Sequence, residues 1–129
     1  MNAINKAMWA EVFNKLDRDQ ECRVVILSAA GKMFSSGIDL SDLSQLASIV
    51  YSEDDIARKS MMMYQNIRHL QDLFTTIEKC KKPVIGCVHS ACVGAGVDLI
   101  TTTDIRMCTT DAWFCVKEVD MGLAADVGT

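Results

Sequence analysis

The first forty residues predict a helix, a strand and a loop, in that order. Apolar side chains recur at the spacing of one helix face, which predicts an amphipathic helix ending near Asp17. Those side chains are Trp9, Val12, Phe13 and Leu16. The short, β-branched run at residues 22–28 predicts a strand that is buried on both faces in a parallel sheet. Residues 29–37 contain two glycines, so the chain is expected to leave this strand through a loop.

The rest of the chain combines one long helical pattern with short strand patterns. A single apolar stripe predicts the long helix, and it consists of Met63, Ile67, Leu70, Phe74 and Ile77. Pro83 ends this helix and opens a second buried strand at residues 84–88. Small residues at 90–96 then predict a strand-to-helix turn, with the helix following at 97–100. Two further strands are predicted at residues 105–108 and 113–116. This order of elements defines an α/β fold class.

Length and composition favour one globular domain with an apolar core. The chain has 129 residues, of which 50% are hydrophobic, and no apolar run approaches the length that crosses a bilayer, so no membrane partner is expected. The net charge is −4 and the 13 Lys and Arg residues are scattered, which argues against a nucleic-acid partner. The six cysteines form no C-x-x-C pair and lie in apolar surroundings, so we expect buried free thiols. No set of His, Cys and Asp has the spacing of a zinc site, so no metal is expected.

Two glycine-containing turns are the first candidates for a functional site. They lie at residues 35–40 and 93–98, and each can present free backbone N–H groups. One such turn is weak evidence, because turns of this kind often serve only tight packing. Neither turn matches the P-loop or the dinucleotide-binding pattern, so nucleotide chemistry is excluded.

Four ordered segments make the pattern specific. They are Phe34–Leu40, Lys82–His89, Gly94–Leu99 and Thr103–Arg106. In order and spacing they resemble the signature segments of the enoyl-CoA hydratase/isomerase (crotonase) family, and the resemblance spans nearly the whole chain. It implies a spiral of ββα units in which helices wrap two perpendicular sheets. Residues 1–129 would form a partial crotonase domain that is truncated at both ends.

The resemblance implies that the two turns bind a thioester. In the family, two backbone N–H groups form an oxyanion hole, and these map to Ile38 and Ala95. The loop of Ser36, Gly37, Ile38, Asp39 and Leu40, together with Ala95, would bind substrate and coenzyme A. The similar isomerases carry glycine where this chain has Ala95. No cofactor is implied, because coenzyme A is part of the substrate. Met61, Met62 and Met63 would either contact the acyl chain or pack in the core, and we expect core packing.

Three acidic residues decide the branch of the family. Hydratases use two glutamates, at the positions of Asp98 and Glu118, whereas here the first is an aspartate. The spacing of Asp98, Glu118 and Asp126 instead resembles the Δ3,5-Δ2,4-dienoyl-CoA isomerases. That likeness implies proton removal at C2 by Glu118, proton return at C6 by Asp126, and tuning by Asp98. The alternatives are an enoyl-CoA hydratase, a Δ3,Δ2-enoyl-CoA isomerase, and an inactive fragment or splice product of such an enzyme.

The resemblance also implies a cellular setting and an assembly. The expected role is fatty acid β-oxidation in a mitochondrion or peroxisome, although no targeting signal is visible in the sequence. Family members form homotrimers or hexamers, and the C-terminal helices that support them are expected to be missing here. We therefore expect the isolated chain to depend on partners and to be inactive alone.

Overall fold

The computed structural model describes residues 6–39, 44 and 47–128. The helices are α1 (Lys6–Arg18), α3 (Ile56–Glu78), α4 (Ala95–Thr101) and the short 3-10 helix η1 (Val119–Met121). The strands are β1 (Val25–Ser28), β2 (Val84–Val88), β3 (Ala91–Val93), β4 (Ile105–Cys108) and β5 (Trp113–Cys115). Every predicted element is present. Among the described residues, the sequence missed β3, whose three residues lie within a run of small side chains, the short helix η1, and the helical residues at 47–50.

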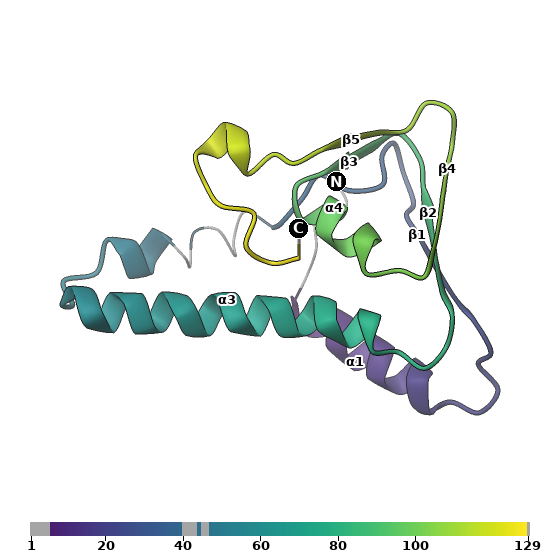
Figure 1. Cartoon of the computed structure of the whole chain (residues 1–129), viewed down its shortest axis with the longest axis horizontal. Helices are drawn as coiled ribbons and strands as arrows, with labels where there is room; N and C mark the ends of the chain where they lie inside the picture. The colour runs from purple at the N-terminus through teal and green to yellow at the C-terminus, as the bar shows by residue number, and fades with distance from the viewer. Residues whose placement is uncertain (1–5, 40–43, 45–46, 129) are drawn as a thin grey trace.

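Two parallel sheets form the framework of the molecule. Strands β1, β2 and β4 pair in that order, and Ile85 of β2 lies between Ile26 and Ile105 in the register. Strands β3 and β5 form the second sheet, and an isolated bridge joins Cys92 of β3 to Ser35. Figure 1 shows the two sheets along different sides of the molecule, with α4 in the corner between them. This arrangement agrees with the expected pair of crossing sheets.

The burial of β1 differs from the prediction. Val25 and Leu27 are buried, as expected for one face of a sheet. Ile26, on the opposite face, is 63% exposed, so the prediction of a strand buried on both faces was wrong. The reason is that α1, α3 and α4 pack on a single face of this sheet within the described residues. The prediction of a parallel pairing is confirmed.

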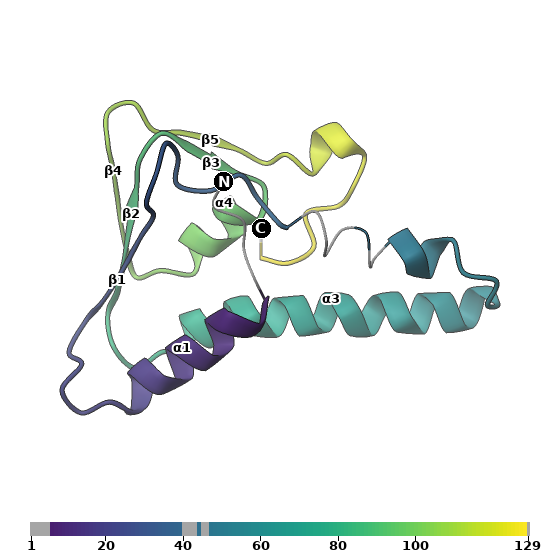
Figure 2. The same cartoon turned by 180° about the vertical axis from the view of Figure 1, so that it is seen from behind.

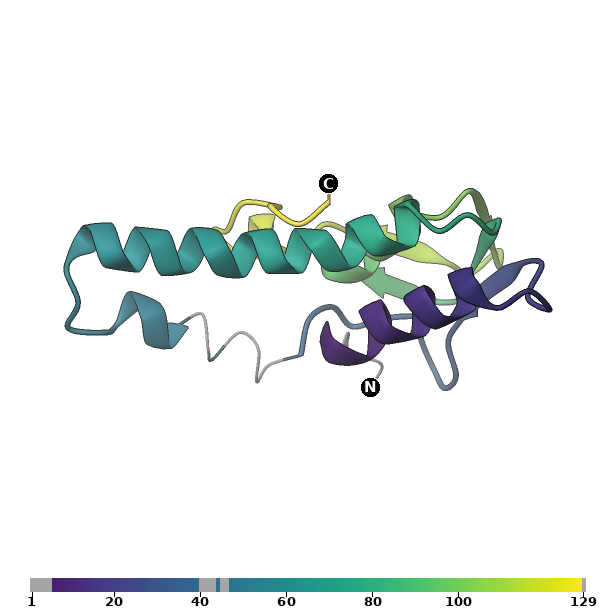
Figure 3. The same ribbon diagram turned by 90° about the horizontal axis from the view of Figure 1, so that it is seen from below.

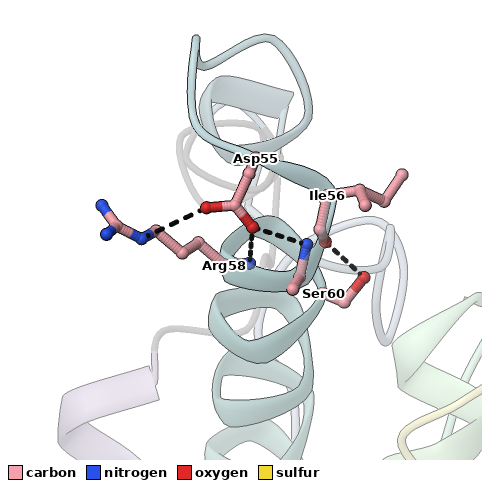
Figure 4. Close-up of polar contacts among 5 residues, drawn as sticks. Asp55, Ile56, Arg58 and Ser60 are labelled. Atoms are coloured by element: carbon pink, nitrogen blue, oxygen red, sulfur yellow. Dashed lines mark hydrogen bonds and ion pairs between the residues drawn. The ribbon is translucent and has the colours of Figure 1, made fainter.

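Helix α3 is the longest element and begins with a side-chain cap. The Asp55 carboxylate accepts hydrogen bonds from the N–H groups of Ala57 and Arg58, at 3.0 and 3.1 Å, and also pairs with the Arg58 guanidinium (Figure 4). A cap of this kind contributes about 1 kcal/mol to helix stability. Figure 3 shows the N-terminal half of α3 reaching beyond the sheets. As a result Met61 and Met62 are exposed, and the prediction that they pack in the core was wrong.

The core lies where α1, the C-terminal half of α3 and α4 meet the sheets. In Figure 2, α1 lies beside the last turns of α3. The main aromatic and aliphatic residues of the core are Phe13, Val25, Leu27, Phe74, Ile77, Val84, Leu99 and Ile100. Each large apolar side chain buried in this way contributes about 1.5–3 kcal/mol relative to an exposed one. The core therefore fixes the sheets and α4, on which most of the candidate site is built.

The cysteines differ in how far they are buried. All six cysteines are free in the structure. The prediction of buried thiols holds for Cys92, whereas Cys108 is exposed and the other four are half-buried. Cys92 is fully buried. In the described residues, no helix has the length and apolar character to cross a membrane. Within the same residues no group of three His, Cys, Asp or Glu side chains is arranged to hold a metal ion.

Candidate active site

The two predicted turns lie against each other. The Ser35 N–H donates to the Ala91 carbonyl and the Val93 N–H donates to the Ser35 carbonyl, both at 3.1 Å. These bonds extend the β3–β5 sheet by one short segment. They bring the chain around Ile38 next to the start of α4, although the two segments are more than fifty residues apart in sequence.

Ile38 and Ala95 line one cavity of about 340 Å³. Within the described part of the chain, neither of their N–H groups donates a hydrogen bond to the protein. Two unused backbone donors at one cavity are what an oxyanion hole requires, because fixed donors stabilise negative charge as it develops on a substrate oxygen. The structure thus brings the two predicted donors together.

Gly94 makes the sharp turn between β3 and α4. Its φ and ψ angles are 53° and −128°, a conformation that a side chain would strain. A Cβ atom at this position would also lie only 3.1 Å from Oε1 of Glu118. Glycine therefore allows both the turn and the close approach of the glutamate.

Ala95 follows as the first residue of α4 and is buried. Ser90 is the only described residue other than glycine with a positive φ, so Ala95 adopts an ordinary backbone conformation. Its methyl group causes no backbone strain, and the presence of alanine in place of glycine is compatible with a working N–H donor.

Glu118 is held by a short turn of its own. Its carbonyl accepts hydrogen bonds from the N–H groups of Met121 and Leu123, each at 3.0 Å, which closes the chain around η1. The side chain lines the 340 Å³ cavity, and its Oε2 atom is buried with no hydrogen-bond partner among the described residues. A buried carboxylate oxygen without a partner is costly, and such atoms are rare unless a ligand or a reaction uses them.

Asp98 lies behind the cavity wall. It is 1% exposed on α4 and is absent from the residues that line the cavity. Burial, and then the negative charge of Asp98, raise the pKa of the Cys92 thiol to about 11. Asp98 thus acts on the neighbouring thiol through its charge, and its tuning of the reaction stays a prediction.

Asp126 reaches the same cavity from an irregular segment. Asp126 lies in the exposed stretch after η1 and lines the cavity together with Glu118. The Asp126 carbonyl accepts a hydrogen bond of 2.6 Å from Nε2 of Gln71 on α3. The structure therefore places Glu118 and Asp126 at one cavity, and Asp98 next to it.

The cavity wall includes residues that the sequence did not identify as functional. Met63, Ile67 and Leu70 of α3 form one side, and Met121 and Leu123 contribute to another. The helical stripe was visible in sequence, but core packing was the preferred prediction, and acyl-chain contact was considered only for the methionines, of which Met63 does line the cavity. In the predicted coenzyme A loop, Ser36, Gly37 and Asp39 do not line this cavity, and Leu40 lies outside the described residues.

The structure combines an α/β fold with one cavity that is lined by two acidic residues, and comparison with known proteins gives its family. The model of the enoyl-CoA hydratase/isomerase family matches residues 1–129. The chain belongs to the enoyl-CoA hydratase/isomerase family. This confirms the resemblance of the four sequence segments and the expected fold class.

Two relatives and one solved structure place the chain more closely. The mitochondrial Delta(3,5)-Delta(2,4)-dienoyl-CoA isomerase of Homo sapiens is 53% identical over 99% of this chain and 40% of its own length. The peroxisomal isomerase of the same name from Arabidopsis thaliana is 45% identical, over the whole chain and 48% of its own length. A structure described as an enoyl-CoA hydratase of Thermobifida fusca with acetoacetyl-CoA has a TM-score of 0.75 and 29% identity, over 98% of this chain and 50% of that one. The chain thus spans less than half of the curated relatives it matches.

Proposed function

We propose that the protein isomerises 3,5-dienoyl-CoA thioesters to 2,4-dienoyl-CoA thioesters in fatty acid β-oxidation. The observation that carries this proposal is the single cavity lined by Ile38, Ala95, Glu118 and Asp126. Two backbone donors and two carboxylates at one largely apolar cavity match a reaction that forms an enolate and moves a proton along an acyl chain.

The reaction begins at the carbon next to the thioester. Glu118 removes a proton from C2, and the electron pair passes into the conjugated system, with negative charge on the thioester oxygen. The N–H groups of Ile38 and Ala95 stabilise that oxygen, each by about 2.7–4 kcal/mol. The buried Oε2 of Glu118, which has no partner among the described residues, suits a group whose partner is the substrate proton.

The reaction ends at the far side of the diene. Asp126 gives a proton to C6, which leaves the double bonds at C2 and C4. One proton is removed and one is added, so the conversion is balanced and needs no oxidant, reductant or added cofactor. Asp98 would set the electrostatic environment from behind the wall, because it is buried beside Cys92.

The similar proteins support the substrate class and the location of this activity. The relatives with 53% and 45% identity are named dienoyl-CoA isomerases, one mitochondrial and one peroxisomal. We therefore place the protein in one of these organelles, with an acyl-CoA as its small-molecule partner. A trimeric or hexameric assembly, a domain that extends over residues 1–129, and a coenzyme A contact at Ser36, Gly37, Asp39 and Leu40 are part of the same proposal.

The test compares two reactions of the protein that contains this chain. It is incubated with a 3,5-dienoyl-CoA, and the conjugated product is followed by its near-ultraviolet absorbance. It is also incubated with a 2-enoyl-CoA, and hydration is followed as loss of the enoyl absorbance. We expect isomerisation to be the faster reaction and to fall about 10²–10⁴-fold in Asp126→Asn.

Asp120→Asn is the matched control, because Asp120 is exposed and pairs with Lys117 away from the cavity lining. It should retain normal turnover. Efficient hydration with little isomerisation, or full isomerisation in Asp126→Asn, would contradict the proposal.

A further inference from the structure

The loop that carries Asp126 is fixed differently from the rest of the site. Residues 123–128 form neither helix nor strand. Among the described residues, the hydrogen bond from the Gln71 side chain to the Asp126 carbonyl is the only one that reaches residues 124–128. Val127 packs against the core on one side of this point. Beside the packing of Val127, the position of Asp126 therefore depends on a hydrogen bond from one side chain of α3, 55 residues earlier in the chain.

Arg68 sets the orientation of the Gln71 amide. Nη1 of Arg68 lies 2.8 Å from Oε1 of Gln71, one helical turn away on α3. A guanidinium can only donate hydrogen bonds, so the oxygen of the amide must face Arg68. The NH₂ group must then face the opposite way, where it meets the Asp126 carbonyl at 2.6 Å. The three residues form one directional chain of hydrogen bonds.

Gln71 and Arg68 do not line the cavity that is bordered by Glu118 and Asp126. They line a separate, more open space of about 520 Å³ on the other side of the segment that contains Asp126. Asp126 borders both spaces. Gln71 therefore reaches the 340 Å³ cavity through its hydrogen bond to Asp126 and not by lining it, which makes it a positioning residue and not a catalytic one.

We propose that Gln71, oriented by Arg68, is a positioning residue that holds Asp126 at the distance from which it protonates C6. The proposal rests on the function proposed above. It assigns a separate task to each side of the cavity, because Glu118 has its own support in η1 and in the Gly94 turn. Loss of the Gln71 contact should impair the second proton transfer and leave the first one nearly intact.

The test uses Gln71→Glu in the protein that contains this chain. This change keeps the size of the side chain and its contact with Arg68, but it replaces the donor that faces the Asp126 carbonyl with an acceptor. Gln71→Leu removes the polar group altogether. Gln65→Glu and Gln65→Leu are the matched controls, because Gln65 is exposed on the same helix and its side chain makes no hydrogen bond among the described residues.

Each variant is incubated with a 3,5-dienoyl-CoA in deuterium oxide. Deuterium at C2 of recovered substrate reports proton removal by Glu118, and formation of the 2,4-diene reports the complete reaction. We expect both Gln71 variants to lose about 10-fold in kcat for isomerisation, since a misplacement of about 1 Å can cost up to about 10²-fold. Exchange at C2 should stay within about twofold of the parent, so the ratio of exchange to isomerisation rises.

Asp126→Asn is measured alongside as the reference. A parallel loss of exchange and isomerisation in the Gln71 variants would show a general structural effect and overturn the proposal. So would unchanged isomerisation in these variants when Asp126→Asn is impaired. If Asp126→Asn itself isomerises normally, the proposed role of Asp126 is wrong, and so is the positioning role of Gln71. If Asp126→Asn is impaired and the Gln71 variants are not, only the positioning role of Gln71 is wrong.

Discussion

The two sides of the cavity are built in different ways. On one side, the Glu118 carboxylate lies against Gly94, at the junction of the β3–β5 sheet and α4, and buried Asp98 and Cys92 lie nearby. On the other side, Asp126 lies in an exposed, irregular segment with one hydrogen bond from α3. The first side is fixed by the core, and the second by one hydrogen bond and the packing of Val127.

This difference separates stability from function in the two regions. Changes on the buried side should alter both the free energy of unfolding and the chemistry, because the same atoms serve both. Changes on the Asp126 side should alter turnover with little effect on folding, because few buried contacts depend on that segment.

Glu118→Gln should have the largest effect. Loss of the general base is expected to lower the rate of isomerisation about 10²–10⁴-fold and to lower the rate of hydrogen exchange at C2 by the same factor. The melting temperature should not fall, because the change removes a negative charge from an oxygen that is buried and unpartnered among the described residues. Steady-state kinetics and thermal unfolding measure the two quantities. Glu53→Gln, at an exposed position, serves as the control.

Gly94→Ala should impair both activity and stability. The new methyl group would meet Oε1 of Glu118 at 3.1 Å, and the backbone has a φ of 53°. We expect a loss of up to about 10²-fold in turnover from displacement of Glu118. The strained backbone should lower the free energy of unfolding by about 1–3 kcal/mol.

Gly31→Ala separates these two effects. Gly31 also has a positive φ, of 93°, but a Cβ atom there would meet nothing within 4 Å. The free energy of unfolding of Gly31→Ala should therefore fall by about 1–2 kcal/mol, and its turnover should be unchanged. Equal turnover in the two variants would show that Gly94 does not position Glu118.

Cys92 should make the stability of the buried side sensitive to alkaline pH. Burial and then the charge of Asp98 raise its pKa from 9.0 to about 11 in the folded protein. Below pH 9.0 both states keep the thiol proton and the contribution to stability is complete. Between pH 9.0 and about 11 the unfolded state loses the proton first, so the free energy of unfolding falls as the pH rises.

The expected decrease across this window is about 1–3 kcal/mol. Denaturant unfolding of the parent and of Cys92→Ala at several pH values measures it. The difference between their slopes of unfolding free energy against pH gives the contribution of the Cys92 thiol. Cys108→Ala, at an exposed position, serves as the control substitution. Identical slopes in the parent and Cys92→Ala would contradict the prediction.

Ala95→Gly should have the smallest effect. The backbone at Ala95 is ordinary, so glycine relieves no strain, and its greater flexibility in the unfolded chain should lower stability by about 0.5–1 kcal/mol. The N–H donor remains, so turnover should be retained or slightly raised. A marked loss of activity would show that the methyl group is a required contact with the substrate.

The sequence predicted the framework of the site better than its walls. The strands, the turn at Gly94 and the family resemblance follow from local patterns, and the spacing of Asp98, Glu118 and Asp126 could be compared with relatives along the chain. The exposed face of Ile26 could not be predicted in this way, because its burial depends on which elements cover β1. The apolar run looks the same in either case.

The contribution of α3 to the cavity was missed for a related reason. A stripe that contains Met63, Ile67 and Leu70 has helical spacing whether it faces a core or a cavity. The hydrogen bond of Gln71 to Asp126 carries no local signal at all, because its two residues are 55 positions apart. Only the packing of the helix against the C-terminal segment brings them together.

The six free thiols have a practical consequence as a set. Cys108 is open to solvent, Cys92 is sealed beneath the Glu118 side, and the other four lie between these extremes. A thiol reagent should therefore modify Cys108 within its mixing time and reach Cys92 only when the wall of the site opens. The rate of Cys92 modification relative to that of Cys108 would report how often the wall opens. Mass spectrometry with and without a bound acyl-CoA would measure it.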